Sequence, residues 1–274
     1  MSIIRDELEN SRRLITENYD NKPTGFKNIL LNANGLINQR GYVSGTATVV
    51  DNEYTLDRWR VVLTGEALAF DTVNNITTFT APLNGIEQVI EDITIISGNY
   101  TLSYTGTGTA TISQSSDNVT YTEVTANTDG SYMLTGGLYT KVTLIDGTFS
   151  LIQLEEGSVA TPFEQRPYGL ELSLCQRYYQ VMENIMSLAI STSRINCSYF
   201  HSVTPKTLPS YTFYSENVTI GDTSVYNDIY TDIGASLRGS VQQSLNGLLF
   251  ITDNNSKLTS GNYYSINYIA DAEL

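Results

Sequence analysis

The sequence is poor in histidine, and this shortage limits the chemistry that the chain can perform. One histidine, His201, is present among 274 residues. A Ser-His-Asp or Cys-His catalytic site needs a histidine as its base. His201 lies in the alternating segment CSYFHSV, which is typical of a residue on the surface of a strand. We therefore expect no catalytic histidine.

Metal and phosphate sites also lack their usual residues. One histidine and two cysteines that lie 22 positions apart do not make a zinc-binding pattern. The segment Gly106-Thr107-Gly108 has neither the lysine nor the following helix of a phosphate-binding loop, and it is typical of a hairpin turn. We expect neither a resident metal nor a cofactor.

Charged residues are scarce, and negative charge dominates among them. They make up 16% of the chain, and the formal net charge is −14. Such a charge repels phosphate-rich partners at long range, which excludes nucleic acid and anionic membranes as main partners. Tyr, Thr, Ser, Asn and Gly are abundant instead, a composition typical of extracellular β-rich proteins.

Cysteine is rare, and no apolar segment is long enough to cross a membrane. Cys175 lies in a helix-like stretch and Cys197 in a strand-like one, so we expect two buried thiols, with a disulfide as the alternative. No apolar run approaches the ~20 residues that span a bilayer. Residues 1–10 lack the apolar core of a signal peptide, which predicts synthesis in the cytoplasm without membrane insertion.

Residues 2–19 form an amphipathic pattern that predicts a short helix. Ser2 is a candidate N-cap, and acidic residues precede basic ones along the segment. Its apolar residues Ile4, Leu8 and Ile15 follow about two heptads of a coiled coil. Two heptads are too short to be stable alone, so the segment must pack on the body or join an oligomer.

A succession of short β patterns, separated by Gly, Asn and Asp, fills residues 28–165. This rhythm predicts one antiparallel jelly-roll sandwich. The predicted strands are residues 46–50, 58–63, 76–80, 87–96, 100–104, 109–113, 121–125, 139–144 and 150–154.

Two prolines and a glycine interrupt the β rhythm at residues 161–169. Residues 170–182 then place apolar side chains at helical spacing, which predicts a junction helix of about three turns within residues 166–183. Residues 184–274 return to strands as a second, smaller β domain. The predicted strands there are residues 187–190, 195–202, 210–215, 248–252 and 263–270. The fold class is therefore all-β, with short helices at the N-terminus and at the junction.

Three stretches together resemble a module of bacteriophage tail-fibre and receptor-binding proteins. NILLNANGLINQRG (residues 28–41) with TLDRWR (55–60) is similar to the opening of that family. IQLEEGSVATPFEQRPYGLELSLCQRYY (152–179) is similar to its junction, and YYSINYIADAEL (263–274) to its terminus. The resemblance implies a carbohydrate-binding-module-like jelly roll, a helical junction, a small C-terminal β domain and a homotrimer within a virion. The resemblance does not identify the ligand, because proteins of this family differ in their recognition loops.

Residues 1–27 and 181–262 have no counterpart in that family. We expect residues 1–27 to attach the protein to other virion proteins and the C-terminal β domain to recognise a host-surface glycan. Aromatic faces stack on the apolar faces of sugars, while their hydroxyl groups form hydrogen bonds at the rim. The candidate glycan-binding residues, several of which we expect to be core residues instead, are Tyr211, Tyr214, Tyr226, Tyr230, Tyr263 and Tyr264.

A threefold seam follows from the family likeness and from the predicted helix. The candidate seam residues are Leu172, Cys175, Tyr179, Met182 and Met186. A rival hypothesis from another class is a purely structural virion component, such as a head fibre, a decoration protein or a tail-assembly protein. Its partner would be another virion protein, and its sandwich would serve as a spacer.

The matched residues favour structural roles. Trp59, the single tryptophan, is expected in the core between two sheets, with a sugar-stacking platform as the alternative. Glu155 or Glu164 is expected to pair with Arg166 or Arg58 and so hold the exit of the sandwich to the helix.

Carboxylates leave two further alternatives open. Glycoside hydrolysis needs only two carboxylates at a suitable separation. Asp51, Glu53, Asp57, Glu87, Glu91 and Asp92 are available in the sequence. Any chain with 29 acidic residues offers such pairs by chance, so we expect no enzyme. Asp-Asn turns at residues 51–53, 117–118 and 253–255 supply oxygens that calcium accepts, although turn propensity alone explains them.

Overall fold

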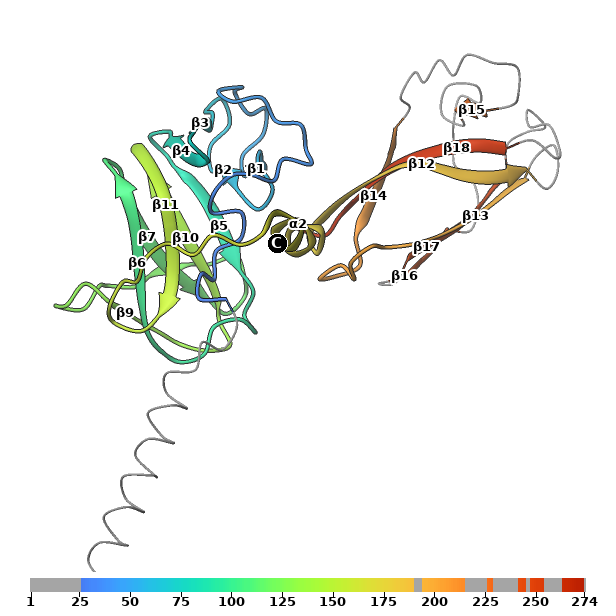
Figure 1. The fold of residues 1–274 in the computed structure, drawn as a ribbon. Coiled ribbons are helices and arrows are strands. Elements are labelled where there is room, and N and C mark those ends of the chain that lie inside the picture. The colour runs from blue at the N-terminus through green and yellow to red at the C-terminus, as the bar shows by residue number, and fades with distance from the viewer. Residues whose placement is uncertain are drawn as a thin grey trace, which may run out of the picture.

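The computed structural model describes residues 26–189, 194–214, 226–228, 241–244, 247–253 and 263–273, with side chains for 26–183, 185, 201–212 and 267–273. The predicted N-terminal helix lies outside these residues. Within them the chain consists of three β-sheets and one helix, which confirms the all-β class. Figure 1 shows two of the sheets on one side of helix α2 and the third sheet on the other side. None of the described helical residues makes a segment long and apolar enough to cross a membrane.

Two sheets of residues 53–156 form a sandwich. The first sheet, in spatial order among the described residues, consists of β1 (Glu53–Tyr54), β2 (Arg60–Val61), β5 (Ile86–Ile90), β10 (Tyr139–Ile145), β7 (Thr109–Ser115) and β8 (Thr122–Glu123). The second sheet consists of β3 (Ala69–Val73), β4 (Ile76–Ala81), β11 (Gly147–Glu156), β6 (Gly98–Gly106) and β9 (Tyr132–Leu134). All their pairings are antiparallel.

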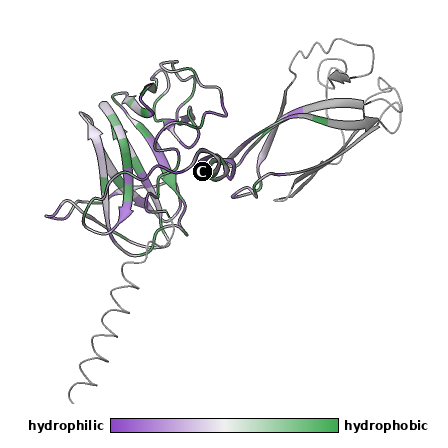
Figure 2. Cartoon of the chain, in the orientation of Figure 1, coloured by the Kyte–Doolittle hydropathy of each residue, from purple (hydrophilic) through white to green (hydrophobic). Residues whose placement is uncertain are grey.

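Alternating side chains of both sheets build one core. In β10 the residues Thr140, Val142 and Leu144 are buried while their neighbours are half-buried, which is the period of two that a strand imposes. The same alternation of hydrophobic and hydrophilic residues is visible along the sandwich strands in Figure 2. Trp59 is fully buried, and its ring meets Phe79 edge to face at 5.6 Å. The core position predicted for Trp59 is therefore confirmed.

Two tight turns carry the chain from one sheet to the other. The first joins β6 to β7 and the second joins β10 to β11. Gly106 has a φ of +157°, and an added Cβ there would overlap the backbone oxygen of Thr148 at the start of β11. The hairpin predicted at Gly106–Gly108 is therefore wrong, because the strands on either side pair within different sheets.

One predicted strand, residues 46–50, is a loop. The backbone N–H groups of Val49 and Val50 donate to the Glu53 carboxylate at 2.6 and 3.2 Å, and Thr48 donates to two backbone carbonyls. The bonds from Val49 and Val50 use backbone N–H groups that a sheet ladder would need. The predicted strand at 58–63 is shorter in the structure, where it spans Arg60–Val61. Arg58 has a φ of +70°, which is not a strand conformation.

The junction helix is shorter than the sequence predicts. Helix α2 spans Tyr168–Gln176 and begins after Pro167, which suits the start of a helix because it has no N–H to donate. The chain enters strand β12 (Tyr179–Ala189) at Tyr179. A single helical stripe over residues 170–182 is therefore wrong. Leu172 and Cys175 lie on α2, whereas the other three seam candidates, Tyr179, Met182 and Met186, lie on β12.

The third sheet holds the C-terminal residues. In spatial order its described strands are β14 (Ser210–Tyr214), β18 (Tyr263–Asp271), β12, β13 (Arg194–Phe200), β17 (Gly247–Asp253) and β16 (Val241–Ser244), and β15 (Tyr226–Asp228) pairs with β18. The pairing of β15 with β18 is parallel, and the others are antiparallel. Because β12 lies beside β18, the chain ends next to α2, as Figure 1 shows.

Candidate functional site

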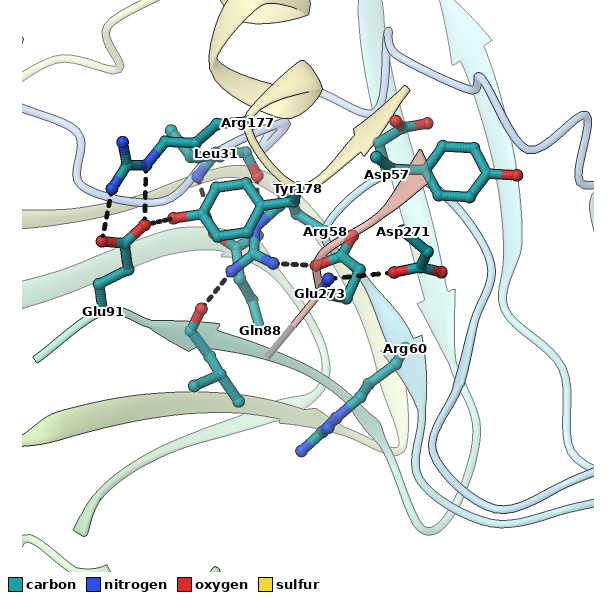
Figure 3. Close-up of polar contacts among 12 residues, drawn as sticks. Leu31, Asp57, Arg58, Arg60, Gln88, Glu91, Arg177, Tyr178, Asp271 and Glu273 are labelled. Atoms are coloured by element: carbon teal, nitrogen blue, oxygen red, sulfur yellow. Dashed lines mark hydrogen bonds and ion pairs between the residues drawn. The ribbon is translucent and has the colours of Figure 1, made fainter. Parts of the chain in front are cut away.

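The end of the chain docks on the sandwich through a buried arginine. Arg58 lies within the turn that the hydrogen bond from the Trp59 N–H to the Leu56 carbonyl closes, and its side chain is 1% exposed. Its guanidinium donates to the carbonyl of Val89 and forms an ion pair with Glu273, as Figure 3 shows. The guanidinium carbon lies 3.5 Å from the ring centroid of Tyr178, a cation–π distance. Burial is the largest single influence and lowers the pKa of Arg58, but Glu273 and the neighbouring groups Tyr178, Tyr54 and Cys175 together outweigh burial, so the pKa is raised overall.

A second arginine, Arg40, binds the same C-terminal residues, 271–273, which we call the tail. Arg40 forms ion pairs with Asp271 at 3.5 Å and with Glu273 at 3.2 Å. Its guanidinium lies 3.7 Å from the ring centroid of Tyr179. The backbone N–H of Ala272 donates to the carbonyl of Tyr178 at 2.7 Å. The tail is thus fixed by backbone, charge and stacking together.

A third contact joins the end of the helix to Glu91, the residue directly after strand β5. Arg177 donates to both oxygens of Glu91, at 3.0 and 3.1 Å, and the hydroxyl of Tyr178 donates to Glu91 at 2.5 Å. Burial raises the pKa of Glu91, but these donors outweigh burial and the pKa is lowered overall. The charged carboxylate is the form that this site stabilises.

A buried carboxylate, Asp57, organises the loop beside Arg40. It accepts the backbone N–H and the side-chain amide of Gln39, both at 2.6 Å. The same amide also donates to the carbonyl of Tyr179 at 2.9 Å. Burial raises the pKa of Asp57, and the bonds from Gln39 oppose that shift only in part. Gln39 therefore links the sandwich to the first residue of β12.

The entry of the sandwich is held by the start of the helix. Arg166 pairs with Glu171 at 2.9 Å and donates to the carbonyls of Asn28 and Leu30. Glu171 in turn accepts the backbone N–H of Asn32. All these groups are buried or nearly so. This network fastens residues 28–32 to α2.

The pairings predicted for Glu155 and Glu164 are wrong. Glu155 accepts the backbone N–H and the hydroxyl of Thr161, both at 2.7 Å. Glu164 accepts the backbone N–H of Asn28 at 2.9 Å. Arg166 and Arg58 take Glu171 and Glu273 instead. The role of holding the exit of the sandwich was expected correctly, but its partners were not.

The three stretches that resemble the phage family meet in these contacts. We call the set Arg40, Arg58, Glu91, Arg177, Tyr178 and Glu273 the junction cluster. The opening stretch supplies Arg40 and Arg58, the middle stretch Arg177 and Tyr178, and the final stretch Glu273. Glu91 alone comes from outside them. Sequence reasoning missed this convergence, although the recurring arginine beside an aromatic residue in DRW and QRYY was a visible signal.

Carboxylates considered for glycoside hydrolysis are engaged in bonds of the fold. Asp57 is held by Gln39, Glu91 by Arg177 and Tyr178, and Glu87 by Arg60 and Lys141. Asp51 accepts the backbone N–H of Thr64 at 2.8 Å. Asp117 accepts from Ser115, Val119 and Thr120, which is the Asp-turn geometry that turn propensity predicts. Among the described residues, no group of three or more His, Cys, Asp or Glu could hold a metal ion.

Tyr211 is half-buried, whereas the other glycan candidates lie outside the described side chains. Its hydroxyl lies 2.9 Å from Nε2 of His201, and the two rings stack at 6.0 Å. Burial lowers the pKa of His201. The backbone pairs Tyr226 with Tyr263, and Tyr214 lies on β14. Tyr264 pairs with Ser187, and Tyr230 lies outside the described residues.

The seam candidates with described positions are mostly covered by the chain itself. Cys175 is fully buried, Tyr179 is 6% exposed and Met182 is 5% exposed, while Leu172 is half-buried. Cys175 is a free thiol, as expected, and burial raises its pKa well above the ordinary value. The side chains of Met186 and Cys197 are outside the described set. The homotrimer stays a prediction, but its subunit interface would have to be formed by residues other than these buried ones.

Comparison with protein-family models, with curated proteins and with solved structures found no match to this chain.

Proposed function

We propose that this chain is a structural component of a bacteriophage particle, of the tail-fibre or receptor-binding type, that adheres to a host-surface glycan. The observation that carries the proposal is the junction cluster. Stretches that resemble the opening, the junction and the terminus of that family come together there, 215 positions apart in the case of Arg58 and Glu273. A resemblance by chance would not be expected to select residues that contact one another.

We also propose that the sandwich is a jelly roll of the carbohydrate-binding-module-like type. The strand orders β4-β11-β6-β9 and β5-β10-β7-β8 support it. The chain alternates between the two sheets from β4 to β7, β7 and β8 then pair within one sheet, and the chain alternates again from β8 to β11. As a result β10 pairs with β5 and β11 pairs with β4. That interleaving is what two nested Greek keys produce. The short strands β1, β2 and β3 extend the edges of the two sheets.

Adhesion rather than catalysis is the function that this geometry favours. The buried carboxylates Asp57, Glu91 and Glu171 each accept bonds from N–H or O–H groups that join separate segments of the chain. Such groups stabilise a connection. A rigid connection between two β modules suits a protein that carries mechanical load between a particle and a cell.

Weak single sites are sufficient for such a role. A site of millimolar affinity is worth about −4 kcal/mol, and several copies on one particle raise the overall affinity by avidity. We propose a homotrimer as the unit. Light scattering should give about three times the chain mass of 30.3 kDa at micromolar concentration. A mass of one chain would contradict the trimer.

The test of the function uses the full chain and a panel of bacterial surface polysaccharides and whole cells. Removing the residues after 181 would also remove Glu273 from Arg58, so substitutions are preferable to truncation. We expect the purified protein to bind at least one glycan or strain. Replacing Tyr226, Tyr263 and Tyr264 together by serine should abolish that binding.

Tyr168→Ser is the matched control, because this tyrosine is 59% exposed on α2 and should not matter. A purified protein that binds no cell and no glycan, yet copurifies with capsid or tail proteins, would overturn adhesion. That result would support the purely structural virion component.

A further inference from the structure

Four large apolar side chains are exposed at the edge of the first sheet, where loops surround the short strands β1 and β2 (Figure 1). The exposed fractions are 81% for Val49, 56% for Val50, 42% for Leu63 and 69% for Leu83. Covering such side chains with a partner removes apolar surface from water, which favours association. We call these four residues the apolar patch.

Hydrogen bonds hold the three segments that carry the apolar patch side by side. The N–H of Gly65 donates to the carbonyl of Thr48 at 2.9 Å, and the N–H of Asn52 donates to the carbonyl of Val62 at 3.1 Å. The N–H of Val62 donates in turn to the carbonyl of Gly85 at 3.1 Å. Each of these five residues lies within two positions of a member of the apolar patch. The exposed side chains therefore belong to one neighbourhood of the surface.

Two carboxylates are fixed within this neighbourhood by backbone N–H groups. Oε2 of Glu53 accepts the N–H groups of Val49 and Val50, at 2.6 and 3.2 Å. Oδ1 of Asp51 accepts the N–H of Thr64 at 2.8 Å. These bonds hold both carboxylates directly beside the apolar patch, but they do not neutralise the negative charges.

Glu66 adds a third carboxylate. It accepts the side-chain amide of Asn84, next to Leu83, at 2.8 Å. The segments 43–53, 62–66 and 83–85 contain these three acidic residues and neither lysine nor arginine. Among the described residues, none of the three carboxylates forms an ion pair. The apolar patch is therefore bordered by negative charge that has no counter-charge within the fold.

We propose that the apolar patch and its three carboxylates are a docking surface for a polypeptide segment of another protein, in which apolar residues stand beside Lys or Arg. Burial of the apolar side chains supplies affinity, while ion pairs at the rim orient the segment and speed its association. The charge complementarity selects this occupant. This surface is independent of the proposed adhesion to a glycan.

Charge argues against the other occupants. Two copies of the chain that met through this surface would oppose the same three carboxylates, on chains that each have a net charge of −14. Anionic membranes and nucleic acids are repelled for the same reason. Aliphatic side chains also lack the flat aromatic faces on which sugars stack.

The experiment measures binding of the full-length protein to two immobilised peptides of equal length. One peptide alternates leucine with lysine, and the other alternates leucine with glutamate. We expect binding to the lysine peptide and none to the glutamate peptide. Val49→Ser combined with Val50→Ser should weaken that binding about tenfold, which is the effect of losing about one buried apolar side chain. Both side chains are exposed, so the thermal midpoint should be retained.

Val119→Ser combined with Val159→Ser is the matched control, because these valines are 80% and 75% exposed on other loops. This control should change the affinity less than about twofold. Equal weakening by the two pairs, no binding to the lysine peptide, or equal binding to both peptides would overturn the inference. Self-association that depends on Val49 and Val50 would also overturn it, because the occupant would then be a second copy.

The charged rim is tested separately. Glu53→Gln combined with Glu66→Gln keeps the side-chain oxygens that accept N–H groups but removes two charges. We expect binding about threefold weaker or more, with a smaller dependence on salt. Glu123→Gln combined with Glu156→Gln removes the same charge at exposed positions elsewhere and should have less effect. Equal effects of the two pairs would show attraction by net charge alone and would overturn the docking surface, whereas binding to glycans would be unaffected.

Discussion

Arg58 and Glu273 stand 215 positions apart in the sequence, and their side chains form an ion pair that is almost completely shielded from water. Arg58 is held from three sides, by Glu273, by the carbonyl of Val89 and by the ring of Tyr178. A buried charge without its partner is costly, so the position of the tail and the conformation of the sandwich surface depend on each other.

Replacing Glu273 by glutamine should destabilise the protein strongly. The substitution leaves Arg58 charged and buried without a counter-charge, which costs about 3–5 kcal/mol. Denaturation by urea should show this loss in the midpoint. Glu156→Gln, at an exposed position on β11, is the control and should cost less than about 0.5 kcal/mol. Equal stability of the two variants would show that the tail is not docked in solution.

The pH dependence of stability should carry the signature of Glu91. Its folded pKa is lowered from 4.5, so its contribution is fully present above pH 4.5 and is lost as the pH falls through the folded pKa. Glu91→Gln should therefore cost about 1–2 kcal/mol at pH 7, a value reduced because Arg177 is 38% exposed. That difference should shrink as the pH falls below 4.5. A difference that stays constant down to pH 3 would contradict the assignment.

Cys175 should be unreactive in the folded protein. Its thiol is fully buried, and burial raises its pKa well above the ordinary value, so little thiolate exists at neutral pH. In a Cys197→Ser background, a maleimide or disulfide reagent should label the chain only after unfolding. Val159→Cys, at a position that is 75% exposed, should be labelled within minutes. Rapid native labelling of Cys175 would contradict its burial.

The single tryptophan should report on the sandwich core. Trp59 is fully buried and donates from its indole nitrogen to the carbonyl of Asn32 at 3.0 Å. Its native fluorescence should be blue-shifted and shielded from acrylamide, and added glycan should leave it unchanged. Trp59→Ala should cost about 3–5 kcal/mol through the cavity it leaves. Quenching in the native protein as strong as in the unfolded one would restore the sugar-platform alternative.

Local patterns predicted the strands whose two faces differ. In β4 and β10 apolar residues alternate with polar ones, and the sequence placed both within about one residue. Strand β5 is buried on both faces, because Arg58 contacts Val89 and the helix end contacts Glu91, directly after the strand. A local sequence pattern could not predict this burial, since it depends on residues more than 80 positions away.

The end of the helix and the partners of the ion pairs also could not be predicted from local sequence patterns. The spacing of Leu172, Cys175 and Tyr179 is helical, but the tertiary contacts of Tyr178 and Tyr179 with Arg58 and Arg40 draw the chain into a strand. Which carboxylate meets Arg58 is decided by the path of the whole chain. The sequence offered 29 acidic residues for that position.

The most direct test of the docked tail is a double-mutant cycle on Arg58 and Glu273, with Arg58→Met, Glu273→Gln and the double variant measured by urea denaturation. Residues in direct contact couple by about 0.5–3 kcal/mol, whereas separated residues add within about 0.3–0.5 kcal/mol. We predict a coupling above about 1.5 kcal/mol, with the double variant more stable than the sum of the two single losses implies. Additive losses would contradict a junction in which the end of the chain holds the sandwich to the C-terminal sheet.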